Sequence, residues 1–353
     1  MTLIGQVAGL GWSGVTLFFV LSGYLIAMVL SSLRETDFCF ERFWCRRLFR
    51  ILPAYFMLLV AYFLARLFLF QALGGAHAFD HIIPDWSHFL FIQNFFMAKT
   101  GYLGNGWLRV TWSLAIEMQF YLFISLLFLW IPGKYFWHWS AGLACLALIL
   151  RYLLFFTAEH ADAALVVLFP CRMDSFFMGC MLYSAVSLKP HIFQQKAFRL
   201  LMAAIAVVSF ALVWLVSVGA FYRYRGLVSP LYYSWLNLGF TALLALGLGP
   251  PANMPIFRLP LRFLTLSGRW SYFLYLFHFP VLLVLFRLLL KGEPNLLHVQ
   301  AMGVTILALA TVYVLAAFSY KYIEHPLIKF SHPLFEKPGQ AVEMVPAAKN
   351  SDQ

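Results

Sequence analysis

The sequence predicts an all-α protein, a polytopic bundle of about nine helices that crosses a membrane. Of its 353 residues, 63% are hydrophobic and only 11% are charged, whereas soluble domains carry about 25% charged residues. Apolar runs long enough to cross a bilayer also recur from end to end. We therefore expect one transmembrane domain over residues 1–332 and a short, disordered cytoplasmic tail over residues 333–353, which is polar and rich in proline.

Nine apolar segments are candidate membrane spans. They cover residues 12–33, 51–73, 109–131, 137–157, 162–187, 198–220, 231–249, 270–290 and 299–321. The segment 86–97 is apolar but too short to span, so we expect it to be interfacial or re-entrant. No Gly/Ser linker or internal repeat divides the runs, which favours a single bundle.

The positive charges lie mainly between the apolar runs. Sixteen Lys and Arg residues fall on one side of the predicted membrane, five on the other and four within spans. This bias places the larger group, and the C-terminus, in the cytoplasm. Membrane topology thus explains the net charge of +11 better than a nucleic-acid partner does. Nine spans leave the N-terminus outside, although the sequence begins with no recognisable signal peptide.

Several familiar sites are not predicted. The five cysteines form no C-x-x-C pair, so we expect reduced thiols and no metal site. The sequence contains no Walker A motif, no G-x-G-x-x-G and no G-x-S-x-G. These absences argue against an ATP-driven pump, a dinucleotide enzyme and a serine hydrolase.

The segment Thr111–Tyr121 opens an apolar run and carries an acid. Glu117 falls inside the predicted span, and the helical period places Ser113, Phe120 and Tyr121 on the same face. A carboxylate at that depth needs a protein interior, water or a partner. A functional acid and a structural acid paired with an Arg on another helix are equally compatible with this position.

A cytoplasmic loop over residues 41–53 concentrates arginine at the membrane surface. Arg46, Arg47 and Arg50 lie within one helical turn of each other, and Arg makes forked, permanently charged contacts that suit phosphate. One interpretation is a site for a phosphorylated cytoplasmic ligand. The alternative, anchors that meet lipid headgroups, is favoured from these residues alone.

Opposite charges also lie within the run Pro170–Gly179. Arg172 and Asp174 are two residues apart, so on a helix they point to different faces and we expect each to have its own partner. Pro170 is expected to break the helix nearby. We favour a structural role for Asp174, paired with Arg66, Arg151 or Arg172, and a helix-packing role for Ser175 and Gly179.

The segment Ser271–Pro280 carries the one histidine well within a predicted span, His278. Tyr275 lies three residues earlier, so its phenol is expected near the imidazole. An imidazole of near-neutral pKa is the usual general base, although a lone membrane histidine is more often a helix-packing residue.

Six segments, in this order along the chain, resemble the acyltransferase-3 family of integral membrane O-acyltransferases. They are Gly14–Ile26, Arg46–Pro53, Thr111–Tyr121, Arg172–Phe176, Ser271–Pro280 and Tyr322–Pro326. The family moves an acyl group, commonly acetyl, from cytoplasmic acyl-coenzyme A to a hydroxyl of surface polysaccharides, peptidoglycan sugars or similar acceptors. The resemblance implies acyl-coenzyme A as a donor substrate, no tightly bound cofactor, membrane lipids and a glycan as partners, and the bacterial inner membrane as location.

The resemblance also implies roles for particular residues. Arg46, Arg47 and Arg50 are expected to bind the acyl-coenzyme A, and Glu117 is the first catalytic candidate. His278 is a second catalytic candidate at even odds. The resemblance further implies a pocket formed by Trp112, Ser113, Tyr121, Arg172, Asp174 and Tyr275.

The N-terminal region departs from the family pattern. Members usually begin with one more helix, which carries an Arg and a His, so ten helices are expected in an intact member. Here the chain enters the Gly14–Ile26 segment almost at once. A missing first helix also explains why the N-terminus is predicted to lie outside. We therefore expect either a truncated form or a variant that lacks the usual catalytic base.

Two other functional classes fit part of the sequence. Intramembrane charges suit a transporter or flippase of acyl groups or lipid-linked sugars equally well. A non-catalytic homologue, acting as a membrane partner or sensor, fits the missing first helix.

Overall fold

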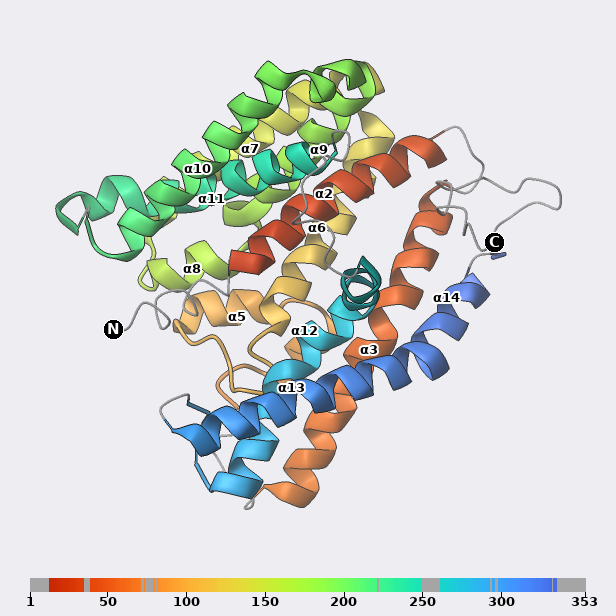
Figure 1. Cartoon of the computed structure of the whole chain (residues 1–353), viewed down its shortest axis with the longest axis vertical. Helices are drawn as coiled ribbons and strands as arrows, with labels where there is room; N and C mark the ends of the chain where they lie inside the picture. The colour runs from red at the N-terminus through yellow and green to blue at the C-terminus, as the bar shows by residue number, and fades with distance from the viewer. Residues whose placement is uncertain are drawn as a thin grey trace.

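The structure is a computed structural model that describes residues 13–34, 39–70, 73, 79, 81–220, 222–248, 261–292, 294–295, 298–331 and 333–334. Helices and short turns make up these residues and none of them forms a β-strand, so the all-α prediction is confirmed. The predicted tail lies outside the described residues except for Pro333 and Leu334. In Figure 1 the helices form one bundle.

Nine longer helices and several short connecting ones follow each other along the described part of the chain. The first half contains α2 Gly14–Leu33, α3 Cys39–Leu69, α4 Asp85–Phe89, α5 Gln93–Thr100, α6 Thr111–Trp130 and α7 Phe136–Thr157. The second half contains α8 Ala161–Val167, α9 Phe169–Leu188, α10 Lys196–Ser217, α11 Arg225–Gly247, α12 Leu261–Leu290 and α13 Val299–Ser319. A π-helical turn, η7 Tyr320–Glu324, leads into α14 His325–Ser331.

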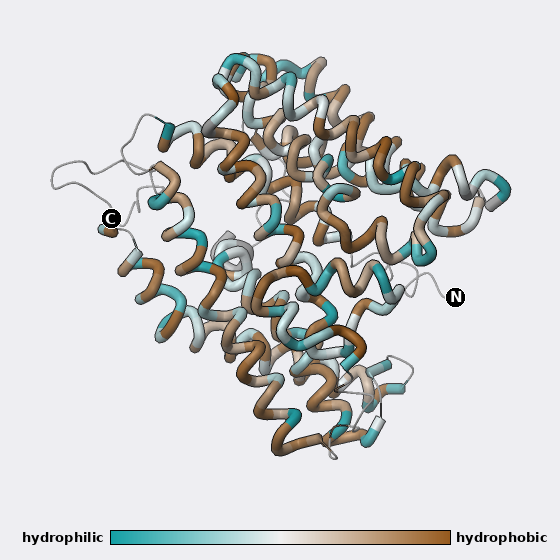
Figure 2. Tube along the Cα trace, turned by 180° about the vertical axis from the view of Figure 1, so that it is seen from behind, coloured by the Kyte–Doolittle hydropathy of each residue, from teal (hydrophilic) through white to brown (hydrophobic). Residues whose placement is uncertain are grey.

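Eight stretches of the described chain are long and apolar enough to cross a membrane, and they match eight of the nine predicted spans. The ninth prediction, 231–249, falls on α11, which has 23 residues but is not among the eight. Pro230, Asn237 and several tyrosines and serines lower its apolar character. Figure 2 shows hydrophobic residues along the long helices and hydrophilic ones mainly towards their ends.

Two local predictions differ in outcome. The prediction that the arginine segment over residues 41–53 forms a loop is wrong, because α3 already begins at Cys39 and runs through Pro53. Leu and Arg are good helix formers, and a transmembrane helix tolerates an internal proline. The break expected near Pro170 is confirmed, since α8 ends at Val167 and Pro170 lies in the first turn of α9, where its missing N–H breaks no helical hydrogen bond.

The segment 86–97, predicted not to span, forms parts of two short helices. Helix α4 has five residues and α5 has eight, with Leu90–Ile92 between them. Three side chains of this region, His88, Gln93 and Asn94, are fully or almost fully buried. One side of the segment therefore packs against the protein, whereas Trp86, Phe89, Leu90 and Phe95 are exposed, and the segment does not cross the bundle.

The helices form two groups that meet along a seam. Helices α2, α7, α9, α10 and α11 pack on one another in the first group, and α3, α12, α13 and α14 pack together in the second. Helix α6 contacts α2 and α9 and lies between the two groups in Figure 1. The two groups bring segments from the beginning, middle and end of the sequence to the seam.

Two glycines let α2 and α9 approach closely. A Cβ atom on Gly23 would fall on the backbone carbonyl of Phe176, and one on Gly179 would fall on the carbonyl of Val20. Small residues permit such backbone approach in membrane helix pairs. The packing role predicted for Gly179 is therefore confirmed, whereas Ser175 donates a hydrogen bond to Oδ1 of Asn237 on α11 at 2.8 Å.

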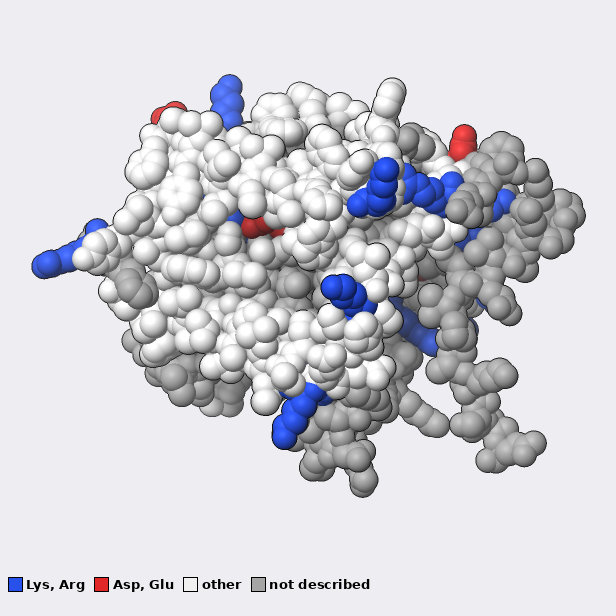
Figure 3. Space-filling view, turned by 90° about the horizontal axis from the view of Figure 1, so that it is seen from above, with Lys and Arg blue, Asp and Glu red and all other residues white. Residues whose placement is uncertain are grey.

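The outer surface carries few charges. On the face shown in Figure 3, uncharged residues cover most of the surface, and Lys and Arg outnumber Asp and Glu. Large apolar side chains such as Leu67, Phe68 and Ile306 are more than half exposed. A membrane solvates such side chains, so this surface agrees with an integral membrane protein.

We expect Gly23→Ala and Gly179→Ala to destabilise the protein by about 1–3 kcal/mol each, because the new methyl groups must push α2 and α9 apart. Thermal unfolding of the detergent-solubilised protein measures the change. Gly142→Ala is the matched control, since nothing lies within 4 Å of its Cβ position. An equal unfolding temperature for Gly23→Ala and Gly142→Ala would contradict the proposed contact.

Candidate active site

A first cavity, the arginine cavity, has a volume of about 260 Å³. It lies where α2 and α3 meet α12, η7 and α14. Three of the predicted donor-binding residues, Arg46, Arg47 and Arg50, line it, together with Arg269 of α12. The remaining lining residues are Val29, Phe43, Tyr272, Tyr320, Glu324, Ile328 and Ser331.

The spacing of the arginines explains why they gather. Arg46 and Arg50 are one turn apart on α3, and Arg47 lies beside them on the same side of the helix. Arg47 points inward, with its guanidinium carbon 5.8 Å from the centre of the Tyr121 ring. Four guanidinium groups against one carboxylate, that of Glu324, make the cavity suited to an anion with several negative charges.

A second cavity, the Glu117 cavity, has a volume of about 250 Å³ and lies between α2, α6 and α12. Its polar lining residues are Ser113 and Glu117 of α6 and Ser271, Tyr272 and Tyr275 of α12. Its apolar side is formed by Gly14, Val15, Phe18, Leu114 and Leu276. This cavity combines an apolar wall with hydroxyl groups and a carboxylate.

Glu117 is 4% exposed and lies in the wall between the two cavities. The hydroxyl of Tyr121 donates a hydrogen bond to its Oε1 atom, and Ser22 of α2 also bonds to its side chain. Arg47 and Arg50 are close enough to act on its charge. The predicted shared face is therefore confirmed for Ser113, Glu117 and Tyr121, whereas Phe120 stacks on Phe176 of α9 with ring centres 4.1 Å apart.

A pair of hydroxyl groups lies on the other side of the Glu117 cavity. Ser113 Oγ and Tyr275 Oη are 2.8 Å apart, and both hydroxyls bond to the carbonyl oxygen of Val110, at 3.0 and 3.2 Å. This pair joins α12 to the start of α6. It gives the cavity two oriented hydroxyls in addition to the carboxylate of Glu117.

The predicted pocket residues of α6 and α12 separate into those at the Glu117 cavity and one that lies elsewhere. Ser113, Glu117 and Tyr275 line the Glu117 cavity, and Tyr121 lies directly behind it. Trp112 packs edge-on against Phe19 at 6.2 Å and lines neither cavity. The structure thus brings the hydroxyl and carboxylate groups together and leaves the tryptophan in the core.

His278 does not point into the Glu117 cavity. Its side chain is exposed at the protein surface, and its Nδ1 atom lies 2.6 Å from the backbone carbonyl oxygen of Tyr275. The rings of Tyr275 and His278 are 5.9 Å apart, as their spacing predicts. Because the imidazole faces outward, its catalytic role stays a prediction that this geometry does not favour.

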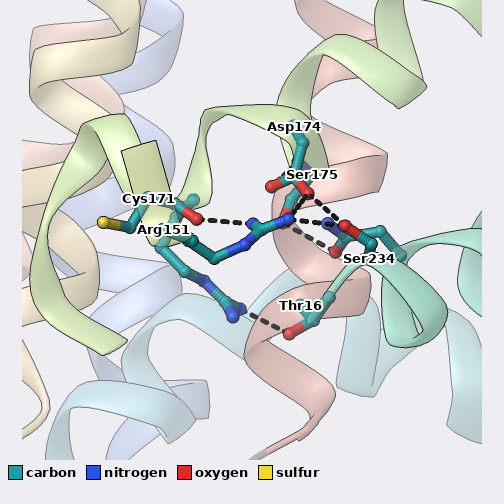
Figure 4. A network of polar contacts seen from close by, with 8 residues as sticks. Thr16, Arg151, Cys171, Asp174, Ser175 and Ser234 are labelled. Carbon is teal, nitrogen blue, oxygen red and sulfur yellow. Dashed lines mark hydrogen bonds and ion pairs between the residues drawn. The ribbon is translucent and has the colours of Figure 1, made fainter. Parts of the chain in front are cut away.

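Arg172 and Asp174 belong to a separate polar network, shown in Figure 4. Arg151 of α7 forms an ion pair with Asp174 at 2.7 Å and donates to the carbonyl of Cys171 at 2.7 Å and to Ser234 Oγ at 2.5 Å. The partner predicted for Asp174 as one of three arginines is therefore Arg151. This network fastens α9 to α7 and α11.

Arg172 has its own partners, as its position on another face predicts. Its Nη2 atom donates to Thr16 Oγ1 at 2.6 Å, and its guanidinium lies over the ring of Tyr233 at 4.2 Å. Neither Arg172 nor Asp174 lines either cavity. Their arrangement favours a structural role within the first helix group.

Three site residues were not predicted from the sequence. Tyr272 lines both cavities, and Arg269 and Glu324 line the arginine cavity. Glu324 is 4% exposed, accepts a hydrogen bond from Ser319 Oγ at 2.7 Å and belongs to the π-helical turn η7. The sequence did contain one signal for Glu324, because this residue is an acid next to an apolar run. Nothing in the sequence indicated the π-helical turn, a feature often found at functional sites.

No three His, Cys, Asp or Glu side chains within the described ranges gather as metal ligands would. The five cysteines carry no disulfide, and Cys171 and Cys180 are buried. The site therefore has to be understood through its arginines, hydroxyls and carboxylates.

Comparisons with known proteins add a family to this geometry. A family described as an acyltransferase domain, Acyl_transf_3, matches residues 3–318, which is most of the chain. The chain belongs to the acyltransferase-3 family. The resemblance carried by the six sequence segments is thereby confirmed, as is the assignment to the O-acyltransferase class at the level of the family.

Two curated relatives of this acyltransferase-3 protein are O-acetyltransferases by name. It is 27% identical over 339 residues to a peptidoglycan O-acetyltransferase of Listeria monocytogenes, which covers 90% of this chain and 51% of the relative. It is 25% identical over 365 residues to an O-acetyltransferase of Staphylococcus aureus, covering 95% and 56%. The chain thus spans about half the length of these relatives. No solved structure matches it significantly.

The ion pair of Arg151 and Asp174 gives a test of the structural interpretation. Asp174→Ala leaves a buried guanidinium without its counter-charge, and we expect a loss of about 3–5 kcal/mol in stability. Asp85→Asn is the control, because the Arg66–Asp85 pair is 30% exposed on both sides and such pairs contribute about 0–1 kcal/mol. Unfolding temperatures in detergent measure both. Equal losses would contradict the structural role.

His88 of α4, which lies outside the eight spans, is expected to make the stability of the folded protein depend on pH. Burial lowers the pKa of His88 to about 4, and Asp85 opposes this shift only weakly. The unfolded chain therefore binds a proton between about pH 6.5 and pH 4 that the folded protein does not, so stability falls as the pH is lowered through this range. His88→Gln is expected to lose this part of the pH dependence, worth up to roughly 3 kcal/mol. Thermal unfolding at pH 7.5 and pH 4.5 compares the two proteins, and identical pH responses would contradict the assignment.

Proposed function

We propose that this protein transfers an acyl group, acetyl in the first place, from acyl-coenzyme A to a hydroxyl group of a cell-surface glycan. The observation that carries the proposal is that an arginine-lined cavity and a cavity with hydroxyls and a carboxylate share one wall. The names of the relatives support acetyl as the group and peptidoglycan as the type of acceptor. The family supports the reaction class.

The arginine cavity is proposed to hold the phosphorylated part of the donor. Arg46, Arg47 and Arg50 are permanently charged and can form paired hydrogen bonds with phosphate oxygens. The bias of sixteen Lys and Arg residues against five supports a cytoplasmic position for this cavity and for the C-terminus, in a bacterial inner membrane. Acyl-coenzyme A is made in the cytoplasm, so donor and cavity then face the same compartment. The donor is a substrate here and not a resident cofactor.

The Glu117 cavity is proposed to receive the acceptor hydroxyl. In the transfer, the oxygen of the hydroxyl attacks the thioester carbon, the new C–O bond replaces the C–S bond, and the hydroxyl proton ends on the released coenzyme A thiol. Glu117 is the one carboxylate among the described residues that line this cavity. Its position next to the wall suits it to orient the hydroxyl or to relay this proton, as an acid–base group must lie within hydrogen-bond reach.

The two rival classes make different predictions for the same assay. A transporter or flippase moves a solute without consuming thioester, whereas the enzyme releases free coenzyme A in proportion to acylated acceptor. A non-catalytic homologue binds without either outcome. Free thiol, measured with acceptor present and absent, therefore separates the three classes.

We expect Arg47→Gln and Arg50→Gln each to raise the KM for acetyl-coenzyme A by about 10- to 100-fold, since each removes a charged hydrogen bond worth about 1.5–3 kcal/mol. Replacing Arg46, Arg47 and Arg50 together is expected to abolish transfer. Lys189→Gln, which removes an exposed charge far from the arginine cavity in sequence, is the control. Transfer retained by the folded triple variant would overturn the donor site.

A further inference from the structure

Tyr272 of α12 lies in the wall between the two cavities. It lines both the arginine cavity and the Glu117 cavity, and among the described lining residues it is the one shared by them. Its side chain is close enough to interact electrostatically with Glu117 in one cavity and with Glu324 in the other. One aromatic side chain therefore faces both proposed substrates.

The side chain of Tyr272 is anchored at its hydroxyl end. The hydroxyl donates a hydrogen bond to the backbone carbonyl of Ile51 on α3 at 3.0 Å. The next residue of α12, Phe273, is buried and stacks on Phe277 with ring centres 4.2 Å apart, which fixes this part of the helix. The side chain thus bridges from α12 to α3 and is not free to move aside like an exposed tyrosine.

We propose that Tyr272 selects the length of the transferred acyl group. This inference rests on the proposed function. Donor carbonyl and acceptor oxygen must approach to about 3–3.5 Å before they react, so the thioester has to reach the shared wall. An acetyl group presents one methyl group at that point. A longer chain then competes with the Tyr272 ring for space, because Tyr272 is the one described residue that lines both cavities.

Other hydrophobic pockets indicate how large the expected effect of acyl length on kcat/KM is. One additional methylene group that a pocket must accommodate or reject changes kcat/KM by about 10- to 200-fold. Butyryl-coenzyme A is two methylenes longer than acetyl-coenzyme A, and we expect the wild-type protein to use it at least 10-fold less efficiently. The balance of the reaction is the same for both donors, with coenzyme A thiol as the released product.

The test measures kcat/KM for acetyl- and butyryl-coenzyme A in Tyr272→Phe, Tyr272→Leu and Tyr272→Ala, using the full chain in detergent or vesicles. Tyr272→Phe keeps the ring, so the ratio of butyryl to acetyl transfer should stay as in the wild type. Tyr272→Leu and Tyr272→Ala open the wall, and the ratio should rise progressively, by about 10-fold or more in the alanine variant. If the alanine variant does not fold, the leucine variant decides the comparison.

Two controls remove an aromatic ring from one cavity only. Tyr320→Ala enlarges the arginine cavity and Phe18→Ala enlarges the Glu117 cavity, and neither residue lines both. Their butyryl-to-acetyl ratio should match that of the wild type even where their overall rates differ. A comparable rise in the ratio of either control would overturn the role of Tyr272 as the selecting residue.

The remaining outcomes separate this inference from the proposed function. If the wild type transfers acetyl but the ratio is unchanged in folded Tyr272→Leu and Tyr272→Ala, the inference is wrong and the function stands. A wild type that uses butyryl as well as acetyl also overturns the inference alone. If the wild type releases no coenzyme A thiol with either donor, the proposed function itself fails.

Discussion

The close approach of α2 and α9 is the constraint on which the arrangement of the site depends. Gly23 and Gly179 remove the side chains that would otherwise separate the two helices. Helix α2 contributes Val29 to the arginine cavity and Phe18 to the Glu117 cavity. Because one helix forms part of both cavities, a shift of α2 away from α9 would change both at once. Two residues without side chains thus determine where the reactive ones lie.

Charges inside the bundle are stabilised in two different ways. The charge of Arg151 is balanced by that of Asp174, and its guanidinium also donates to a carbonyl and a hydroxyl group. Because the two charges neutralise each other, this pair suits a link between helices better than an anion site. The arginine cavity is different, because among the described residues that line it four arginines meet one glutamate. An excess of one charge in a cavity favours a ligand of the opposite charge. This difference distinguishes the structural arginine Arg151 from the proposed functional ones.

The sequence was sufficient for features that depend on local pattern. Hydropathy predicted the bundle, and helical spacing predicted that Ser113 and Glu117 share a face and that Arg172 and Asp174 do not. The sequence was insufficient for features that depend on contacts between segments far apart in the chain. The inward orientation of Arg47 depends on Tyr121 of another helix, and the outward orientation of His278 depends on how α12 packs against α13 and α3. The π-helical turn that presents Glu324 lies between α13 and α14, packs against α3 and has no simple signal in the sequence.

The shared wall also bears on why such a site would transfer an acyl group rather than hydrolyse it. A carboxylate that can orient an alcohol can orient a water molecule equally well, so water must be kept from the thioester. Tyr121, which is 2% exposed, and the bridging ring of Tyr272 lie between Glu117 and the arginine cavity. Under the proposed function, water that entered with a phosphorylated donor would therefore meet two aromatic rings before it reached the carboxylate. An acceptor hydroxyl in the Glu117 cavity would lie against the apolar residues Val15, Leu114 and Leu276, which disfavour water. The wall between the two proposed substrates would then also protect the thioester until the acceptor is in place.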